Sequence, residues 1–162
     1  MKKLIFLIVV SASLFLSCSK DDESASKDNE SSQSCRATNI SMKINGELKT
    51  FTTGGRGIDI IWGTGQYDLS LLFYGSTQGT LRLEMIYKET GNNVIDLLKL
   101  SNFDEAHTGT YELVNDDFES NVLVNRSECF YATFAGKINA NGEELIITEG
   151  VISYEYDEPF GE

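Results

Sequence analysis

Apolar and polar residues alternate through most of the chain, which is the pattern of half-buried β-strands. The clearest case is Thr80–Lys88, where every second residue from Leu81 to Tyr87 is apolar. Tyr67–Tyr74 repeats the alternation, and the glycines at both ends of Gly75–Gly79 favour a turn between the two segments. We therefore expect these two segments to form a β-hairpin.

Turn residues divide the rest of the chain into further strands. Asn45-Gly46 and Asn141-Gly142 predict tight hairpin turns, because Asn and Gly tolerate the positive φ that a type I′ turn requires. Gly54–Gly57 predicts a flexible hairpin loop, and Gly150 predicts a bulge or bend inside the last strand. The predicted strands are Ser41–Ile44, Glu47–Thr52, Ile58–Trp62, Tyr67–Tyr74, Thr80–Lys88, Thr110–Val114, Val122–Asn125, Cys129–Ile138 and Leu145–Tyr156.

Many short strands at close spacing predict an all-β domain with about nine antiparallel strands. Only Asn93–Ala106 lacks a clean period, so it is either a strand with a loop or one short helix. We favour a single β-sandwich, with an up-and-down β-barrel as the alternative, because periodicity does not distinguish the two.

The first residues have the features of a secretory signal. Lys2 and Lys3 precede an apolar run of 13 residues, Leu4–Leu16, which is too short to span a bilayer. The run ends in Leu14-Phe15-Leu16-Ser17-Cys18, which resembles a bacterial lipoprotein lipobox. This resemblance implies that Cys18 is acylated and becomes the mature N-terminus, although Phe15 stands where the pattern prefers Leu.

The residues after this cysteine extend the resemblance. Ser19, Lys20, Asp21, Asp22 and Glu23 are similar to the export signal of Bacteroidota surface lipoproteins. The resemblance implies a protein held in the outer membrane by its lipid and facing the cell exterior. A periplasm-facing anchor is the alternative.

We therefore expect three regions. Residues 1–17 form a signal peptide, and residues 18–35 form the acylated cysteine with an acidic, Ser-rich tether that has no large apolar side chain to bury. Residues 36–162 form the single β domain with a short acidic tail.

The C-terminal half resembles small all-β lipoproteins of unknown function from Bacteroidota. The resemblance rests on Gly109–Tyr111, Ala132–Gly136 and Ile147–Gly150, which are mostly turn glycines and core residues. It implies the fold class and no activity.

Charge and cysteine content narrow the function classes. The chain has 13 basic and 25 acidic residues, and removal of Lys2 and Lys3 with the signal peptide gives 11 − 25 = −14. This acidity argues against nucleic acid as a partner. In an oxidising compartment, Cys35 and Cys129 can form a disulfide, and two free thiols are the alternative.

Few residues point to catalysis or metal binding. His107, the single histidine, could act with Asp104 or another acid, but the chain has no Gly-x-Ser-x-Gly motif, and a solvated loop histidine is the simpler interpretation. Asp116, Asp117 and Glu119 form a weak calcium candidate that is more simply explained as a solvated loop. We expect no cofactor.

Three aromatic residues form a candidate ligand platform: Trp62, Tyr67 and Tyr74. The alternation places Trp62 on the same face as Ile58 and Ile60, which favours its burial. Tyr74 is the better candidate, because it falls on the polar face of its strand.

The sequence thus predicts a non-enzymatic, lipid-anchored protein that binds a glycan or a protein, or serves as an accessory subunit, at the bacterial surface. One alternative is a small hydrolase that uses His107 with nearby carboxylates. Another is an acidic inhibitor or shielding protein for a basic partner. The sequence sets no oligomeric state.

Overall fold

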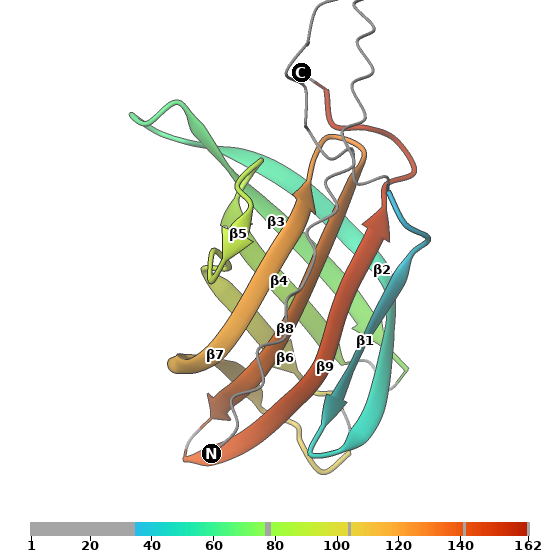
Figure 1. Ribbon diagram of the computed structural model, residues 1–162. Coiled ribbons are helices and arrows are strands. Elements are labelled where there is room, and N and C mark those ends of the chain that lie inside the picture. Colours follow the sequence, from blue (N-terminus) through green and yellow to red (C-terminus); the bar gives the residue numbers. More distant parts are fainter. Residues whose placement is uncertain (1–34, 77–78, 104, 141, 162) are drawn as a thin grey trace, which may run out of the picture. The chain divides into compact units, whose positions relative to one another are not determined.

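The computed structural model describes residues 35–76, 79–103, 105–140 and 142–161, and the side chains of residues 114–116 are excluded. These residues form nine strands and no helix (Figure 1). The predicted signal peptide, Cys18, the export signal and the tether up to residue 34 lie outside the described residues. The strands are β1 (Asn39–Ile44), β2 (Glu47–Ile61), β3 (Gln66–Gly75), β4 (Thr80–Ile86), β5 (Gly91–Asn92), β6 (Leu97–Ser101), β7 (Thr110–Asn125), β8 (Cys129–Ala140) and β9 (Glu143–Glu155).

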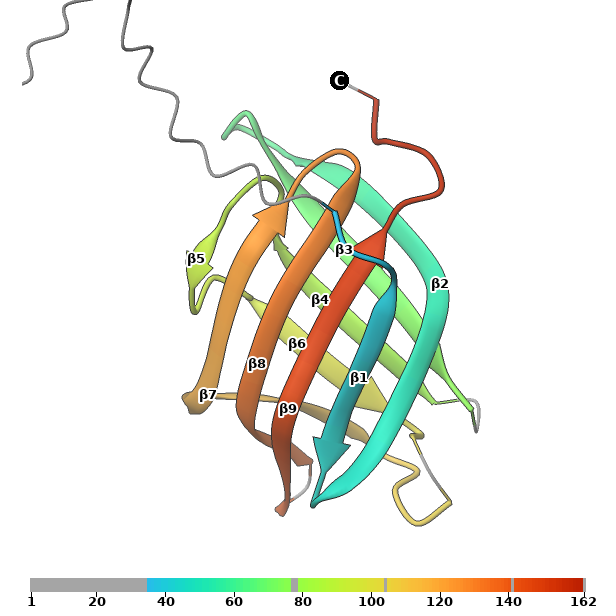
Figure 2. The same ribbon diagram turned by 45° about the vertical axis from the view of Figure 1, so that its right-hand side comes forward.

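Eight of the strands pair in a closed ring, all of them antiparallel (Figure 2). Each ring strand pairs with the ring strands before and after it in the sequence, so β4 pairs with β6. In addition, β1 pairs with β9, and the short β5 adds to β7 outside the ring. The all-β, antiparallel prediction is therefore confirmed. The predicted sandwich is wrong, because the hydrogen-bonded ladder continues around the whole domain. The strands instead form the alternative architecture, an up-and-down barrel.

Two strands are much longer than predicted. β2 joins two predicted strands, and Gly54–Gly57 lies inside it with a register shift between Thr53 and Gly55 instead of forming a loop. β7 joins Thr110–Val114 and Val122–Asn125 across a second irregularity. Long strands with bulges bend strongly, and this bending lets one sheet close on itself.

Apolar side chains fill the barrel interior, as the alternation predicts. Residues at every second position of β1, β3, β4 and β6 are almost fully buried, so each contributes roughly 1.5–3 kcal/mol to stability. The largest fully buried side chains are Phe73, Phe130, Met42, Leu69, Leu71, Leu81, Leu83, Met85, Leu98, Leu100, Ile138 and Leu145.

Two glycines allow β7, β8 and β9 to bend around this core. Gly136 has a φ of 137°, and a side chain there would collide with the backbone of Asp117 and Phe118. Gly150 lies against the ring of Phe134, and a Cβ atom would come within 2.5 Å of it. The register of β1 and β8 against β9 shifts at this point, so the predicted bulge at Gly150 is confirmed.

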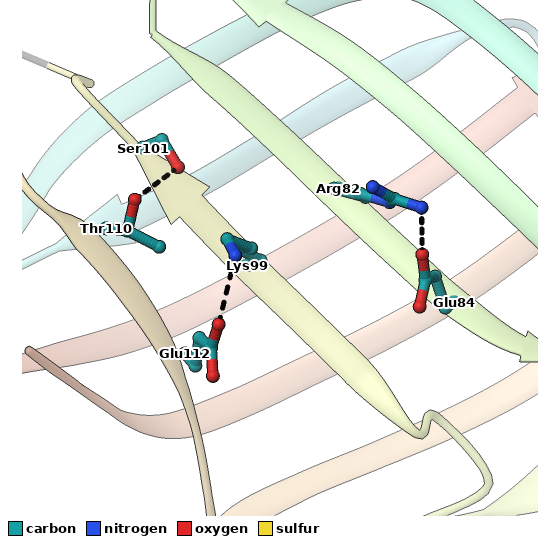
Figure 3. A network of polar contacts seen from close by, with 6 residues as sticks. All are labelled: Arg82, Glu84, Lys99, Ser101, Thr110 and Glu112. Carbon is teal, nitrogen blue, oxygen red and sulfur yellow. Dashed lines mark hydrogen bonds and ion pairs between the residues drawn. The ribbon is translucent and has the colours of Figure 1, made fainter.

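β6 and β7 form the shortest strand pairing in the ring, since only three residues of each strand take part in it. Polar side chains reinforce it on the outer face (Figure 3). Lys99 Nζ lies 3.1 Å from Glu112 Oε1, and the hydroxyls of Ser101 and Thr110 lie 3.2 Å apart. Both contacts join directly opposed residues, so they reinforce this short pairing.

A disulfide bond joins Cys35 to Cys129, as predicted, with their Cα atoms 5.8 Å apart. It attaches the beginning of the described chain to the start of β8, next to Glu155 at the end of β9. The C-terminal segment 156–161 and the tip of the β2–β3 hairpin lie at this same end, which we call the hairpin end (Figures 1 and 2).

Candidate binding sites

The β2–β3 hairpin projects beyond the strands beside it at the hairpin end (Figure 1). Among the described residues, β1 pairs with β2 only up to Phe51, and β4 pairs with β3 only as far as Asp68. The last two pairs of the hairpin, which include Ile60 opposite Tyr67, therefore extend past both neighbouring strands.

Trp62 lies at the tip of this hairpin and is 88 % exposed, so the prediction of its burial is wrong. The predicted face is consistent with the register, since Ile58 lies opposite the buried Leu69 and Ile60 lies opposite Tyr67. The hairpin carries this face beyond the barrel rim, where no opposite wall covers it. Sequence alternation indicates which residues share one face of a strand. It does not indicate where the neighbouring strands end, and that decides whether the face is covered.

The three predicted platform residues do not share one surface. Trp62 and Tyr67 lie at the hairpin end, whereas Tyr74 lies seven residues further along β3, or about 23 Å away. Tyr74 is 47 % exposed, and its ring packs over Gly54, where a Cβ atom would lie only 2.6 Å from it. Tyr74 is thus a separate surface aromatic.

A cavity of about 580 Å³ lies under the projecting hairpin. Its walls are mostly apolar or aromatic, with a lysine and a glutamine at the edge. The lining residues are Ile58, Gly65, Gln66, Tyr67, Ile86, Tyr87, Lys88 and Gly161.

Arg56 packs beside this cavity against the C-terminal segment. Its guanidinium lies 4.7 Å from the ring centre of Tyr156 and 4.5 Å from that of Phe160, and it donates a hydrogen bond to the carbonyl oxygen of Glu158. Phe160 in turn packs edge-on against Tyr87. Burial raises the pKa of the Tyr156 hydroxyl, which has no hydrogen-bond partner among the described residues. This cluster closes the hairpin end of the barrel.

A second hollow, of about 640 Å³, lies across β5, β7, β8 and β9. Most of its lining residues carry an amide, a hydroxyl or a carboxylate group, although the larger part of its exposed lining surface is apolar. The lining residues are Asn92, Asn93, Glu119, Ser120, Asn121, Thr133, Phe134, Ala135, Glu149, Gly150 and Val151. We call this hollow the flank groove.

The register of the sheet places uncharged residues in one row through the flank groove. Asn92 lies opposite Asn121, Asn121 opposite Thr133, and Thr133 opposite Val151. Beyond the groove, the row continues through Ser41 to Thr50 on β1 and β2. Neighbouring strands are about 4.8 Å apart, so this row presents side chains at a regular interval, all of them polar except Val151.

Two residues at the edge of the flank groove have unusual backbone conformations. Asn93 has a φ of 57° and Glu149 a φ of 52°, a region that non-glycine residues rarely occupy. The Asn93 side chain accepts a hydrogen bond of 2.9 Å from the backbone N–H of Ser120, which fixes the turn after β5. Glu149 forms an ion pair of 2.6 Å with Lys43. Asn45, Lys88 and Asn102 have the same backbone conformation elsewhere in the described chain, so it is not specific to this groove.

His107 lies at the opposite end of the barrel from the hairpin tip. Its ring stacks on Phe103 at 4.8 Å, and its Nε2 atom lies 3.4 Å from Glu143, which also accepts a 2.6 Å hydrogen bond from the Tyr111 hydroxyl. These contacts attach the loop before β7 to the start of β9. Asp104, its predicted partner, lies outside the described residues.

The calcium candidate is only partly described. Asp117 forms an ion pair of 3.4 Å with Lys137, Glu119 lines the flank groove, and the Asp116 side chain is not described. No group of three or more His, Cys, Asp or Glu residues could hold a metal ion within the described part of the chain.

Comparison of the chain with protein-family models, curated proteins and solved structures found no match. In the residues that the structure describes, no helix is long and apolar enough to cross a membrane.

Proposed function

We propose that this chain is a non-enzymatic, lipid-anchored binding protein at the outer surface of a bacterial cell, and that its flank groove binds an uncharged saccharide. The observation that carries this proposal is the row of uncharged polar side chains through the groove. The anchor and the outward location rest on the resemblance of residues 14–23 to a lipobox and a surface export signal.

The chemistry of the row suits sugar hydroxyl groups. Each sugar hydroxyl both donates and accepts hydrogen bonds, and the amides of Asn92 and Asn121 and the hydroxyl of Thr133 offer both functions. The chain is strongly acidic, and Glu119 and Glu149 also line the groove, so an anionic ligand would be repelled here whereas an uncharged saccharide would not. Val151 supplies a small apolar surface for the C–H face of a sugar ring.

A glycan array tests this proposal. The probe is the mature chain with Cys18→Ser, which keeps the tether and removes the acylation site. We expect binding to neutral oligosaccharides that is lost in Asn121→Ala and Thr133→Ala. Thr50→Ala is the matched control, because Thr50 lies in the same row but outside the groove, and it should bind as the parent does.

Two outcomes of the array would contradict the proposal. Arrays that stay blank with the parent protein would exclude a saccharide in the groove. Binding that Trp62→Ala abolishes and Asn121→Ala preserves would instead place the saccharide on the predicted aromatic platform. Location is tested separately by proteolysis of intact cells, where full resistance of the protein would argue against surface exposure.

A further inference from the structure

We propose that the tip of the β2–β3 hairpin, residues 60–67, inserts into the lipid surface on which the protein is anchored. The tip consists of Ile60-Ile61-Trp62-Gly63-Thr64-Gly65-Gln66-Tyr67 and has no charged side chain, in a chain of which 23 % is charged. Ile60, Trp62 and Tyr67 are 48 %, 88 % and 44 % exposed. Tryptophan and tyrosine favour the interface between lipid and water, because one ring holds both apolar and polar groups.

The position of the chain start favours lipid as the occupant of this surface. The described chain begins at Cys35, which the disulfide holds at the hairpin end. Only sixteen residues, 19–34, separate it from Cys18 in the sequence. With Cys18 acylated, the attachment of the domain to the membrane is thus at the same end of the barrel as the exposed tip.

The charges below the tip set the depth of insertion. Asp59 and Asp68 lie directly opposite each other on the hairpin and are both exposed. Trp62 lies three positions beyond Asp59, a distance of about 10 Å along an extended strand. That length fits insertion to the level of the lipid headgroups, where surface-bound segments sit roughly 5–10 Å deep.

The acidic residues also indicate which lipids fit. Asp157 and Glu158 lie in the C-terminal segment at the same end of the barrel, so four carboxylates, with Asp59 and Asp68, approach the headgroups. They repel an anionic surface, and we therefore expect insertion into zwitterionic lipid to be stronger than into anionic lipid.

Trp62 is the single tryptophan of the chain and reports its own environment. The acylated protein is reconstituted into phosphatidylcholine vesicles, with and without lipids brominated on their acyl chains, which quench a nearby indole. We expect a blue-shifted emission that the brominated lipids quench and that aqueous acrylamide quenches poorly. Added phosphatidylglycerol should reduce the quenching by brominated lipids.

The control moves the single tryptophan to the far end of the barrel. The variant Trp62→Phe with Leu48→Trp places it at an exposed position next to the Asn45-Gly46 turn, where Leu48 is 62 % exposed. Brominated lipids should leave this emission unchanged. Both positions are on the surface, and thermal unfolding checks that the variant folds as the parent does.

Three outcomes would overturn the proposal: no quenching of Trp62 by brominated lipids, equal quenching at both positions, or protection of Trp62 from acrylamide without lipid quenching. The last would mean that another molecule covers the tip. None of these results bears on the flank groove, whose saccharide binding is measured without a membrane.

Discussion

Reduction of the Cys35–Cys129 bond should lower the free energy of unfolding by about 4–5 kcal/mol. The bond closes a segment of 94 residues, and the chain-entropy model gives about 4.7 kcal/mol for a loop of this length. The folded state should change little, because other contacts hold the same segment. The Ser153 hydroxyl donates a 2.9 Å hydrogen bond to the Ala37 carbonyl oxygen, and Arg36 lies over the ring of Tyr131.

Urea unfolding of the oxidised and the reduced protein measures this difference. With a slope of about 1–3 kcal/mol per molar urea, the midpoint should fall by roughly 1.5 M or more on reduction. The variant Cys35→Ala with Cys129→Ala should behave like the reduced protein, apart from the small loss of packing at the buried Cys129. A loss below about 1 kcal/mol in both forms would refute the reasoning, since it would mean that the bond constrains the unfolded chain very little.

Three further changes test the barrel itself. Gly150→Ala should destabilise it by roughly 1–3 kcal/mol in urea unfolding, because the new methyl group collides with Phe134, and an unchanged midpoint would contradict this packing. Lys99→Glu should cost about 1 kcal/mol by placing a like charge opposite Glu112, and an unchanged loss at high salt would argue against an electrostatic cause. Burial raises the pKa of the Tyr156 hydroxyl above its usual 10.0. As the pH rises, the unfolded chain therefore loses this proton at a lower pH than the folded chain does. The free energy of unfolding should consequently fall above about pH 10. Unfolding at about pH 9 and pH 11 measures that loss, which should be smaller in Tyr156→Phe.

Local patterns predicted the strands that have a clear period and a clear turn. Thr80–Lys88 and the Asn45-Gly46 turn carry their signals within a few residues, and the structure has β4 and a β1–β2 hairpin there. The length of β2 was missed, because Gly54–Gly57 has the composition of a loop and becomes a strand only by pairing with β3. Whether the sheet closes depends on the pairing of β1 with β9, for example of Ile44 with Ile147, and no local pattern encodes a contact between residues so far apart in the sequence.

Some features of the candidate sites could likewise be predicted from the sequence, and others could not. The disulfide was predictable, since only two cysteines remain once Cys18 is set aside. The exposure of Trp62 was not, because it depends on where the neighbouring strands end. The flank groove was also missed, since Asn92, Asn121 and Thr133 come together only through the register of three strands. The presence of an asparagine at position 93 does not predict the groove from the sequence, because asparagines adopt this turn conformation in many proteins.

The opposed carboxylates of Asp59 and Asp68 have a consequence for encounters between two copies of the chain. Like charges directly opposite each other weaken a hairpin, so this pair reduces the stability of the segment that carries it. Beyond Phe51, within the described chain, β2 has no strand on the side away from β3, and such an edge can pair with the same edge of a neighbouring copy. Two hairpins meeting in this way would bring four carboxylates together. The repulsion would disfavour this edge-to-edge pairing of two copies of the chain.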